Sequence, residues 1–142
     1  MTTDMTALEA NKALVRRAIA ANHGPDGDAD ALFAPGFLSH TAGQPAQDRA
    51  AFEAQLAEFG AGFPGYRYEI HEQIAQGDMV ANRVTWHAVH TGVFKGVPAT
   101  GRPVELRGIN LFRVRDGRIV EQWAQPDFLG LMQQIGAIPA GR

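Results

Sequence analysis

The sequence contains no cysteine. It therefore forms no disulfide, holds no metal through thiolates and has no cysteine nucleophile. This absence is typical of proteins in a reducing compartment, and we expect a cytoplasmic protein. No apolar run approaches the roughly 20 residues that a membrane span needs. Lys12, Arg16 and Arg17 interrupt the only N-terminal stretch that could act as a secretory signal, so we expect no membrane association.

Basic residues are also few. The chain has 13 Lys and Arg residues against 15 Asp and Glu residues, for a formal net charge of −2. Nucleic-acid binding needs a clustered excess of positive charge, so nucleic acid is not an expected partner. What remains is 45% hydrophobic and 20% charged residues over 142 positions. That balance is typical of a globular protein and predicts one domain over 1–142, with its core at about 6–136.

The first sixty residues carry helical patterns. Thr6 and Glu9 form a capping box at the start of an apolar stripe with helical spacing, and a Gly-Pro pair follows His23. Proline and glycine residues delimit two further helical segments. The sequence predicts helices over about 6–23, 28–34 and 45–60.

From residue 66 the hydrophobic pattern changes to period two, which is typical of half-buried strands. Asp116-Gly117 is a two-residue hairpin turn and the strongest local signal in the chain. Strands are predicted over 66–73, 79–91, 104–115 and 118–125, with a terminal helix over 128–135. Because the helices precede the strands, we expect an α+β fold with N-terminal helices packed on a curved antiparallel sheet.

The hairpin turn also predicts which side chains share a face of the sheet. A two-residue loop places Val114 opposite Ile119, and regular pairing then places Asn110 opposite Trp123 and Leu106 opposite Asp127. Alternation along the preceding strand adds its even-numbered residues to the same face. The predicted inner face is apolar and holds a few polar groups, which is typical of a small-molecule pocket. It includes Trp86, His90, Gly108, Asn110, Phe112, Trp123, Gln125 and Asp127.

Three residues of that face could carry chemistry, and each has a purely structural alternative. Asp127 could transfer protons, or it could cap the terminal helix. His90 could bond a substrate carbonyl, or lie at a strand end. Asn110 could donate to a ligand, or link neighbouring backbone. His40 either reaches the cavity rim or lies in a surface loop. His87 and His90 are three apart on one strand and point to opposite faces, so we predict no metal site.

Several segments are notable when taken together: His90-Thr91-Gly92, the glycine-rich 96–102, Phe112-Arg113, Asp116–Ile119, Glu121, Trp123 and Pro126-Asp127-Phe128. This combination resembles the SnoaL-like polyketide cyclases of the nuclear-transport-factor-2-like superfamily. The resemblance implies a cone in which a curved antiparallel sheet and N-terminal helices enclose an apolar pocket. Asn110 and Gly108 lie on the strand where some cyclases of the family carry a histidine and a glutamine.

The resemblance further implies an enzyme that needs no cofactor and closes a ring of a polyketide-type natural-product intermediate by intramolecular aldol condensation. The family's acid/base aspartate corresponds to Asp127, which His90 and Asn110 would assist. An apolar small-molecule substrate and a homodimer are implied as partners. The substrate-binding residues would be His40, Tyr66, Trp86, Gly108, Phe112, Trp123 and Gln125.

Two alternatives remain open. The protein could fold a polyene or polyketide for a cycloaddition that needs no base, in which case Asp127→Asn would cost little. It could also be a non-catalytic binder of an apolar metabolite, which would bind tightly and convert nothing.

Overall fold

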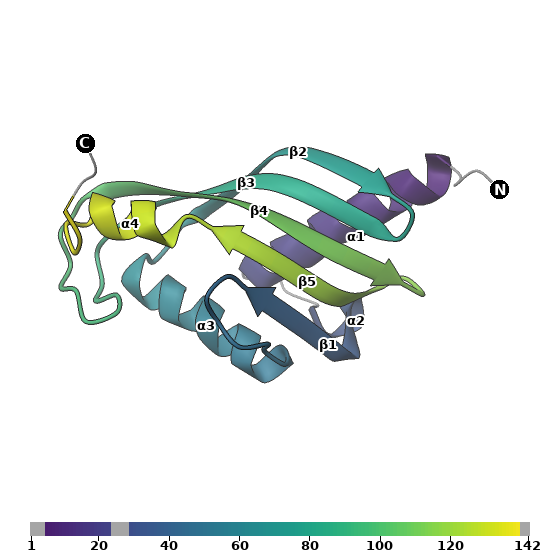
Figure 1. Ribbon diagram of the computed structural model, residues 1–142, viewed down its shortest axis with the longest axis horizontal. Coiled ribbons are helices and arrows are strands. Elements are labelled where there is room, and N and C mark those ends of the chain that lie inside the picture. The colour runs from purple at the N-terminus through teal and green to yellow at the C-terminus, as the bar shows by residue number, and fades with distance from the viewer. Residues whose placement is uncertain (1–4, 24–28, 140–142) are drawn as a thin grey trace.

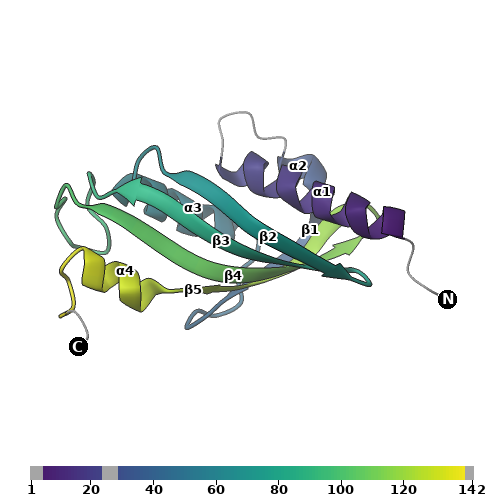
Figure 2. The same ribbon diagram turned by 90° about the horizontal axis from the view of Figure 1, so that it is seen from above.

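The computed structural model describes residues 5–23 and 29–139. In chain order the elements are α1 (Met5–His23), α2 (Ala29–Leu32), β1 (Phe33–Thr41), α3 (Arg49–Gly62), β2 (Arg67–Gln76), β3 (Met79–Val89), β4 (Pro103–Arg115), β5 (Arg118–Pro126) and α4 (Phe128–Gln134). Figures 1 and 2 show the helices α1 and α3 against one face of a strongly curved sheet. The α+β class is therefore confirmed.

The sheet has five strands in the order β1-β5-β4-β3-β2. Four strands form the predicted antiparallel meander, with β2, β3, β4 and β5 paired in sequence. The prediction missed β1, which pairs parallel to β5, so the sheet is mixed rather than antiparallel. Pro35 and Gly36 lie within β1 and disguise it, because both residues are depleted in strands.

Several helix boundaries differ from the predicted ones, and three of the differences have a clear local reason. Met5 is already helical, so Thr6 lies inside the first turn and is not the cap. The second helix stops at Leu32, because Phe33 already belongs to β1. The third helix begins at Arg49, where the side chain of Asp48 accepts a hydrogen bond from the backbone N–H of Ala51 at 2.9 Å.

The predicted register between β4 and β5 is wrong beyond the first two pairs. Val114 does lie opposite Ile119, but Arg113 then pairs with Glu121, so Val120 is an extra residue on β5. Such a bulge exchanges the two faces for every later residue of the strand. Asn110 consequently lies opposite Ala124, and Gly108 lies opposite Pro126.

Two apolar clusters fix the helices on the inner face of the sheet. One joins Val15 and Ile19 of α1 and Phe52 of α3 to inner-face residues of the sheet, including Phe112. The other lies at the far end, where Leu131 of α4 packs among phenylalanines. Between them the helices and the sheet do not close completely.

In the part of the chain that the structure describes, every helix is too short or too polar to cross a membrane.

Candidate active site

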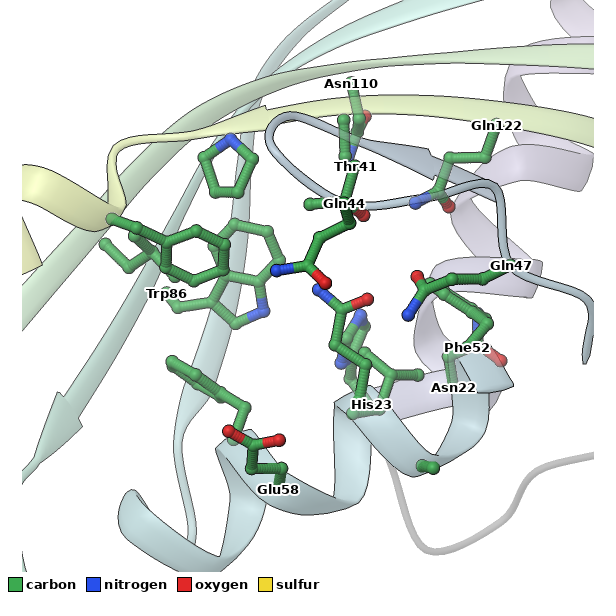
Figure 3. A pocket seen from close by; sticks show the side chains of 18 of the residues that line it. Asn22, His23, Thr41, Gln44, Gln47, Phe52, Glu58, Trp86, Asn110 and Gln122 are labelled. Atoms are coloured by element: carbon green, nitrogen blue, oxygen red, sulfur yellow. The ribbon is translucent and has the colours of Figure 1, made fainter. Parts of the chain in front are cut away.

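A cavity of about 330 Å³ lies between α1, α3 and the inner face of the sheet. This volume is at the lower end of the range of about 300–1,000 Å³ for small-molecule sites. Aromatic and aliphatic side chains dominate its wall, and amides interrupt them. Figure 3 shows Gln122 and Gln47 on one side of the cavity and Trp86 on the other.

His23 and Tyr68 line the polar end of the cavity beneath α1, and Tyr66 contacts His23. The ring of His23, at the last residue of α1, stacks on the ring of Tyr68 with centroids 4.7 Å apart. Its Nδ1 is hydrogen-bonded to the Tyr66 hydroxyl. Burial lowers the pKa of His23 to about 4 and raises the pKa of Tyr66 to about 12. Both side chains are therefore neutral near pH 7.

Asn110 connects this end of the cavity to a second amide. Its Nδ2 donates to the Tyr68 hydroxyl at 3.0 Å, and its Oδ1 accepts from Asn82 Nδ2 at 2.9 Å. Both asparagines are buried, so these bonds satisfy polar groups that would otherwise cost free energy.

The opposite, α3 side of the cavity carries an ion pair and unpartnered amides. Glu58 Oε1 and Lys95 Nζ are 2.9 Å apart and half-exposed. The buried Oε1 atoms of Gln47 and Gln55 have no hydrogen-bond partner among the described residues. Unpaired buried acceptors are costly, and a ligand that carries donors would satisfy them.

The cavity contains three of the ten residues that the sequence predicted for the site: Trp86, Asn110 and Phe112. A fourth, Tyr66, lies one contact away, because it holds His23. Phe112 is almost fully buried and forms part of the first apolar cluster.

Three predicted residues lie on the other side of the sheet, and the bulge at Val120 is the reason. Trp123 and Gln125 pair with the outward-facing Leu111 and Ile109. Asp127 is exposed beside Arg107 and Glu105, and its Oδ1 accepts from the backbone N–H of Gly130 at 2.9 Å. It caps α4, so the helix-cap alternative describes its observed contact, and its expected orientation into the cavity is wrong.

The last three predicted residues are also outside the cavity. His40 stacks on Trp123 on the outer face, with Nε2 2.6 Å from a Glu121 carboxylate oxygen. His90 is completely buried, and its Nδ1 accepts from the Thr100 hydroxyl at 2.9 Å. Gly108 does not line the cavity, and a Cβ there would be 3.1 Å from the Cα of Pro126, which occupies that space.

The sequence analysis missed several cavity residues, among them His23, Gln47, Tyr68 and Gln122. Tyr68 had a usable signal, because it alternates with Tyr66 on a predicted strand. Gln122 faces inward only because of the bulge. Gln47 lies in the segment before α3, where a backbone pair with Ser39 holds it against β1.

Among residues 5–23 and 29–139, no three His, Asp or Glu side chains come together in a way that could hold a metal ion. The polar groups of the cavity are amides, hydroxyls, an imidazole and the Glu58–Lys95 ion pair. These groups can orient a ligand and donate hydrogen bonds to its oxygen atoms.

The fold and the cavity define a class of small α+β proteins with a pocket between helices and sheet, and comparison with known proteins identifies the family. The family model described as "SnoaL-like polyketide cyclase" matches residues 12–135 of this chain. The chain belongs to this family of enzymes.

One relative is the aklanonic acid methyl ester cyclase DnrD of Streptomyces peucetius. It is 30% identical over 102 residues, which cover 72% of this chain and 70% of that one. Two solved structures are similar throughout. IdmH of Streptomyces antibioticus, described as a polyketide cyclase, is 32% identical with a TM-score of 0.76, over 89% of this chain and 98% of that one. AclR of Streptomyces galilaeus, described as a hydroxylase, is 26% identical with a TM-score of 0.83, over 95% of this chain and 86% of that one.

Proposed function

We propose that the protein is a cofactor-independent cyclase that folds a polyketide-type intermediate in the cavity and closes a carbon–carbon bond within it. The observation that carries this proposal is a cavity with a largely apolar wall and neutral hydrogen-bonding groups at one end, in a chain of the SnoaL-like family. Holding the two reacting carbons together replaces an encounter by an intramolecular step, which is worth about 7–11 kcal/mol in well-oriented systems.

The ring closure we favour is of the aldol type. A base removes a proton from a carbon between two carbonyl groups, and the resulting carbanion attacks a second carbonyl carbon of the same molecule. The oxygen of that carbonyl then takes up a proton. The product is an isomer of the substrate, so neither an oxidant nor a reductant is consumed.

The geometry points to Glu58 as the proton acceptor. It is the only carboxylate among the described residues that line the cavity, and only one of its oxygens contacts Lys95. Figure 3 shows its carboxylate on α3 at the edge of the cavity. The carboxylate of Asp127, by contrast, lies on the far face of the sheet. General bases typically contribute about 10²–10⁴-fold to the rate.

The test uses aklanonic acid methyl ester, the compound in the name of the relative DnrD. We expect a product of unchanged mass and altered retention time in liquid chromatography with mass spectrometry. Ala51→Trp, which places a bulky ring at a cavity-lining position of α3, should strongly lower this conversion. Ala50→Trp is the matched control, because Ala50 is equally exposed but does not line the cavity. Absence of conversion of this ester and of simpler linear polyketones would refute the proposal.

A second candidate is ring closure by folding alone, as in a cycloaddition. It is favoured by the neutral groups at the deep end of the cavity, which offer no strong base. Glu58→Gln separates the two mechanisms. The aldol mechanism predicts a loss of kcat of about 100-fold or more, and the cycloaddition predicts an unchanged, pH-independent rate. Glu53→Gln, on the same helix but outside the cavity, is the control.

A further inference from the structure

A row of side-chain hydrogen bonds crosses the protein from its surface to the cavity. Arg16 Nε donates to Gln73 Oε1 at 2.7 Å, and Gln73 Nε2 donates to Asn82 Oδ1 at 2.9 Å. Asn82 Nδ2 then donates to Asn110 Oδ1 at 2.9 Å, and Asn110 Nδ2 donates to the Tyr68 hydroxyl at 3.0 Å. We call these four contacts the amide row.

The direction of the amide row is fixed at its outer end. A guanidinium group only donates, so the oxygen of Gln73 must face Arg16. The carbonyl oxygen of Lys12 only accepts, and it receives Gln73 Nε2 at 3.2 Å. Both anchors give the Gln73 amide the same orientation.

This orientation is passed inward from one amide to the next. The NH₂ group of Gln73 faces Asn82, so the oxygen of Asn82 must turn toward Gln73 and its own NH₂ group toward Asn110. The same constraint at Asn110 leaves an NH₂ group directed at Tyr68. The phenolic oxygen of Tyr68 is therefore an acceptor in this contact, and its single proton is left for another partner.

Tyr68 is held so that this proton is available in the cavity. Its side chain lines the cavity, and none of the described residues accepts a hydrogen bond from its hydroxyl group. The ring is held between His23, stacked at 4.7 Å, and Trp86, edge-on at 4.8 Å. Burial raises the pKa of Tyr68 well above that of a free phenol, so the proton stays on the oxygen at neutral pH.

We propose that the Tyr68 hydroxyl is the hydrogen-bond donor that receives a carbonyl oxygen of the ligand, and that the amide row is the device that aims it. In the reaction, Tyr68 would stabilise the oxygen on which negative charge develops, and Asn110, Asn82, Gln73 and Arg16 are positioning residues. The catalytic part of this inference rests on the proposed function, but the binding of a carbonyl oxygen does not.

The binding part is tested with an unreactive ketone. The probe is 2-acetylnaphthalene that carries carbon-13 at its carbonyl, and the measurement is the isotope-edited infrared spectrum of the bound ketone. A hydrogen bond from Tyr68 lowers the carbonyl stretching frequency. We expect this lowering in the wild-type protein and its loss in Tyr68→Phe. Equal frequencies in the two proteins, or failure of the ketone to bind the wild-type protein, would overturn the proposal.

The positioning part is tested with Asn110→Asp, which replaces the NH₂ group that donates to Tyr68 by an oxygen atom. A carboxylate cannot donate, so the Tyr68 proton should turn toward it and away from the ketone. The frequency should then match that of Tyr68→Phe although the hydroxyl is still present. Lowering the pH until the introduced carboxyl is protonated should restore the wild-type frequency. Asn11→Asp, the same change on α1 away from the cavity, is the control. A wild-type frequency in Asn110→Asp at every pH up to the highest at which the protein stays folded would refute the role of the amide row.

With a converted substrate, Tyr68→Phe should lower kcat by about 100-fold or more and leave KM nearly unchanged, as for loss of an oxyanion donor. Combining it with Asn110→Asp should cause little further loss, because both changes remove the same hydrogen bond. Independent, additive losses would contradict the proposal. Because the infrared measurement needs no turnover, the carbonyl site and the cyclase function can fail separately.

Discussion

Replacing Asp127 separates the two roles that this residue could have, because the structure assigns it a cap and the family resemblance a proton transfer. Its Oδ1 accepts a hydrogen bond from the backbone N–H of Gly130 at 2.9 Å, and the residue is the N-cap of α4. Loss of such a cap typically costs about 1 kcal/mol. The unfolding entropy of about 2.1 cal/mol/K per residue gives about 0.3 kcal/mol/K for this chain, so Asp127→Ala should lower Tm by about 3 °C.

Asp127→Asn should behave differently from Asp127→Ala. The asparagine oxygen can still accept from Gly130, and asparagine is as good a cap as aspartate, so Tm should change little. Turnover of aklanonic acid methyl ester should stay within about twofold of wild type in both variants, since the carboxylate is not in the cavity. Asp48→Ala, which removes the corresponding cap of α3, is the matched control for stability.

The measurements are thermal unfolding by circular dichroism and product formation by chromatography. A general base would be worth about 10²–10⁴ in rate. If Asp127→Asn lost turnover on that scale with an unchanged Tm, the placement of Asp127 outside the cavity would be refuted and the aspartate would be the base.

Three further outcomes follow from the structure. Gly92→Ala should prevent stable folding, because its Cβ would lie 1.9 Å from the Ala61 carbonyl oxygen; expression and thermal unfolding would show this, and a normal Tm would contradict it. Gly108→Ala should lower the free energy of unfolding by about 1–3 kcal/mol through overpacking, since the new Cβ would meet backbone atoms of β5 at 3.1 Å; a denaturant titration checks this, and an unchanged midpoint refutes it. His23 has a folded pKa of about 4 against 6.5 for the free side chain, so the unfolded chain binds more protons between these values and stability is lost as the pH falls from 6.5 toward 4. His23→Leu should flatten that part of the stability profile, and a slope equal to that of wild type would contradict this account.

Much of the architecture could be predicted because it depends on local patterns. Alternation along the predicted strands 79–91 and 104–115 places Trp86, Asn110 and Phe112 on the inner face, and all three line the cavity in the structure. The Asp116-Gly117 turn fixed the first pairs of the hairpin, which are also observed. In both cases the residues are neighbours in sequence, or they follow an uninterrupted period-two alternation along one strand.

Other features depend on contacts between distant parts of the chain. β1 is defined by its parallel pairing to β5, some eighty positions away, and no local signal reports such a partner. The bulge at Val120 is equally hidden, since Ile119 and Trp123 keep an apparently regular apolar spacing. On the outer face Trp123 is covered by His40 from β1, which lets a large aromatic face away from the core.

The fold class, the family and the inner faces of β3 and β4 follow from the amino-acid order alone, because alternation and turn chemistry act over a few residues. Which polar groups share the cavity depends instead on how distant elements pack. One unpaired residue in β5 sent Asp127 to the outside, and packing of α1 on β2 brought His23 onto Tyr68. Such outcomes depend on how whole helices and strands pack, and the hydrophobic alternation within one strand does not predict that packing.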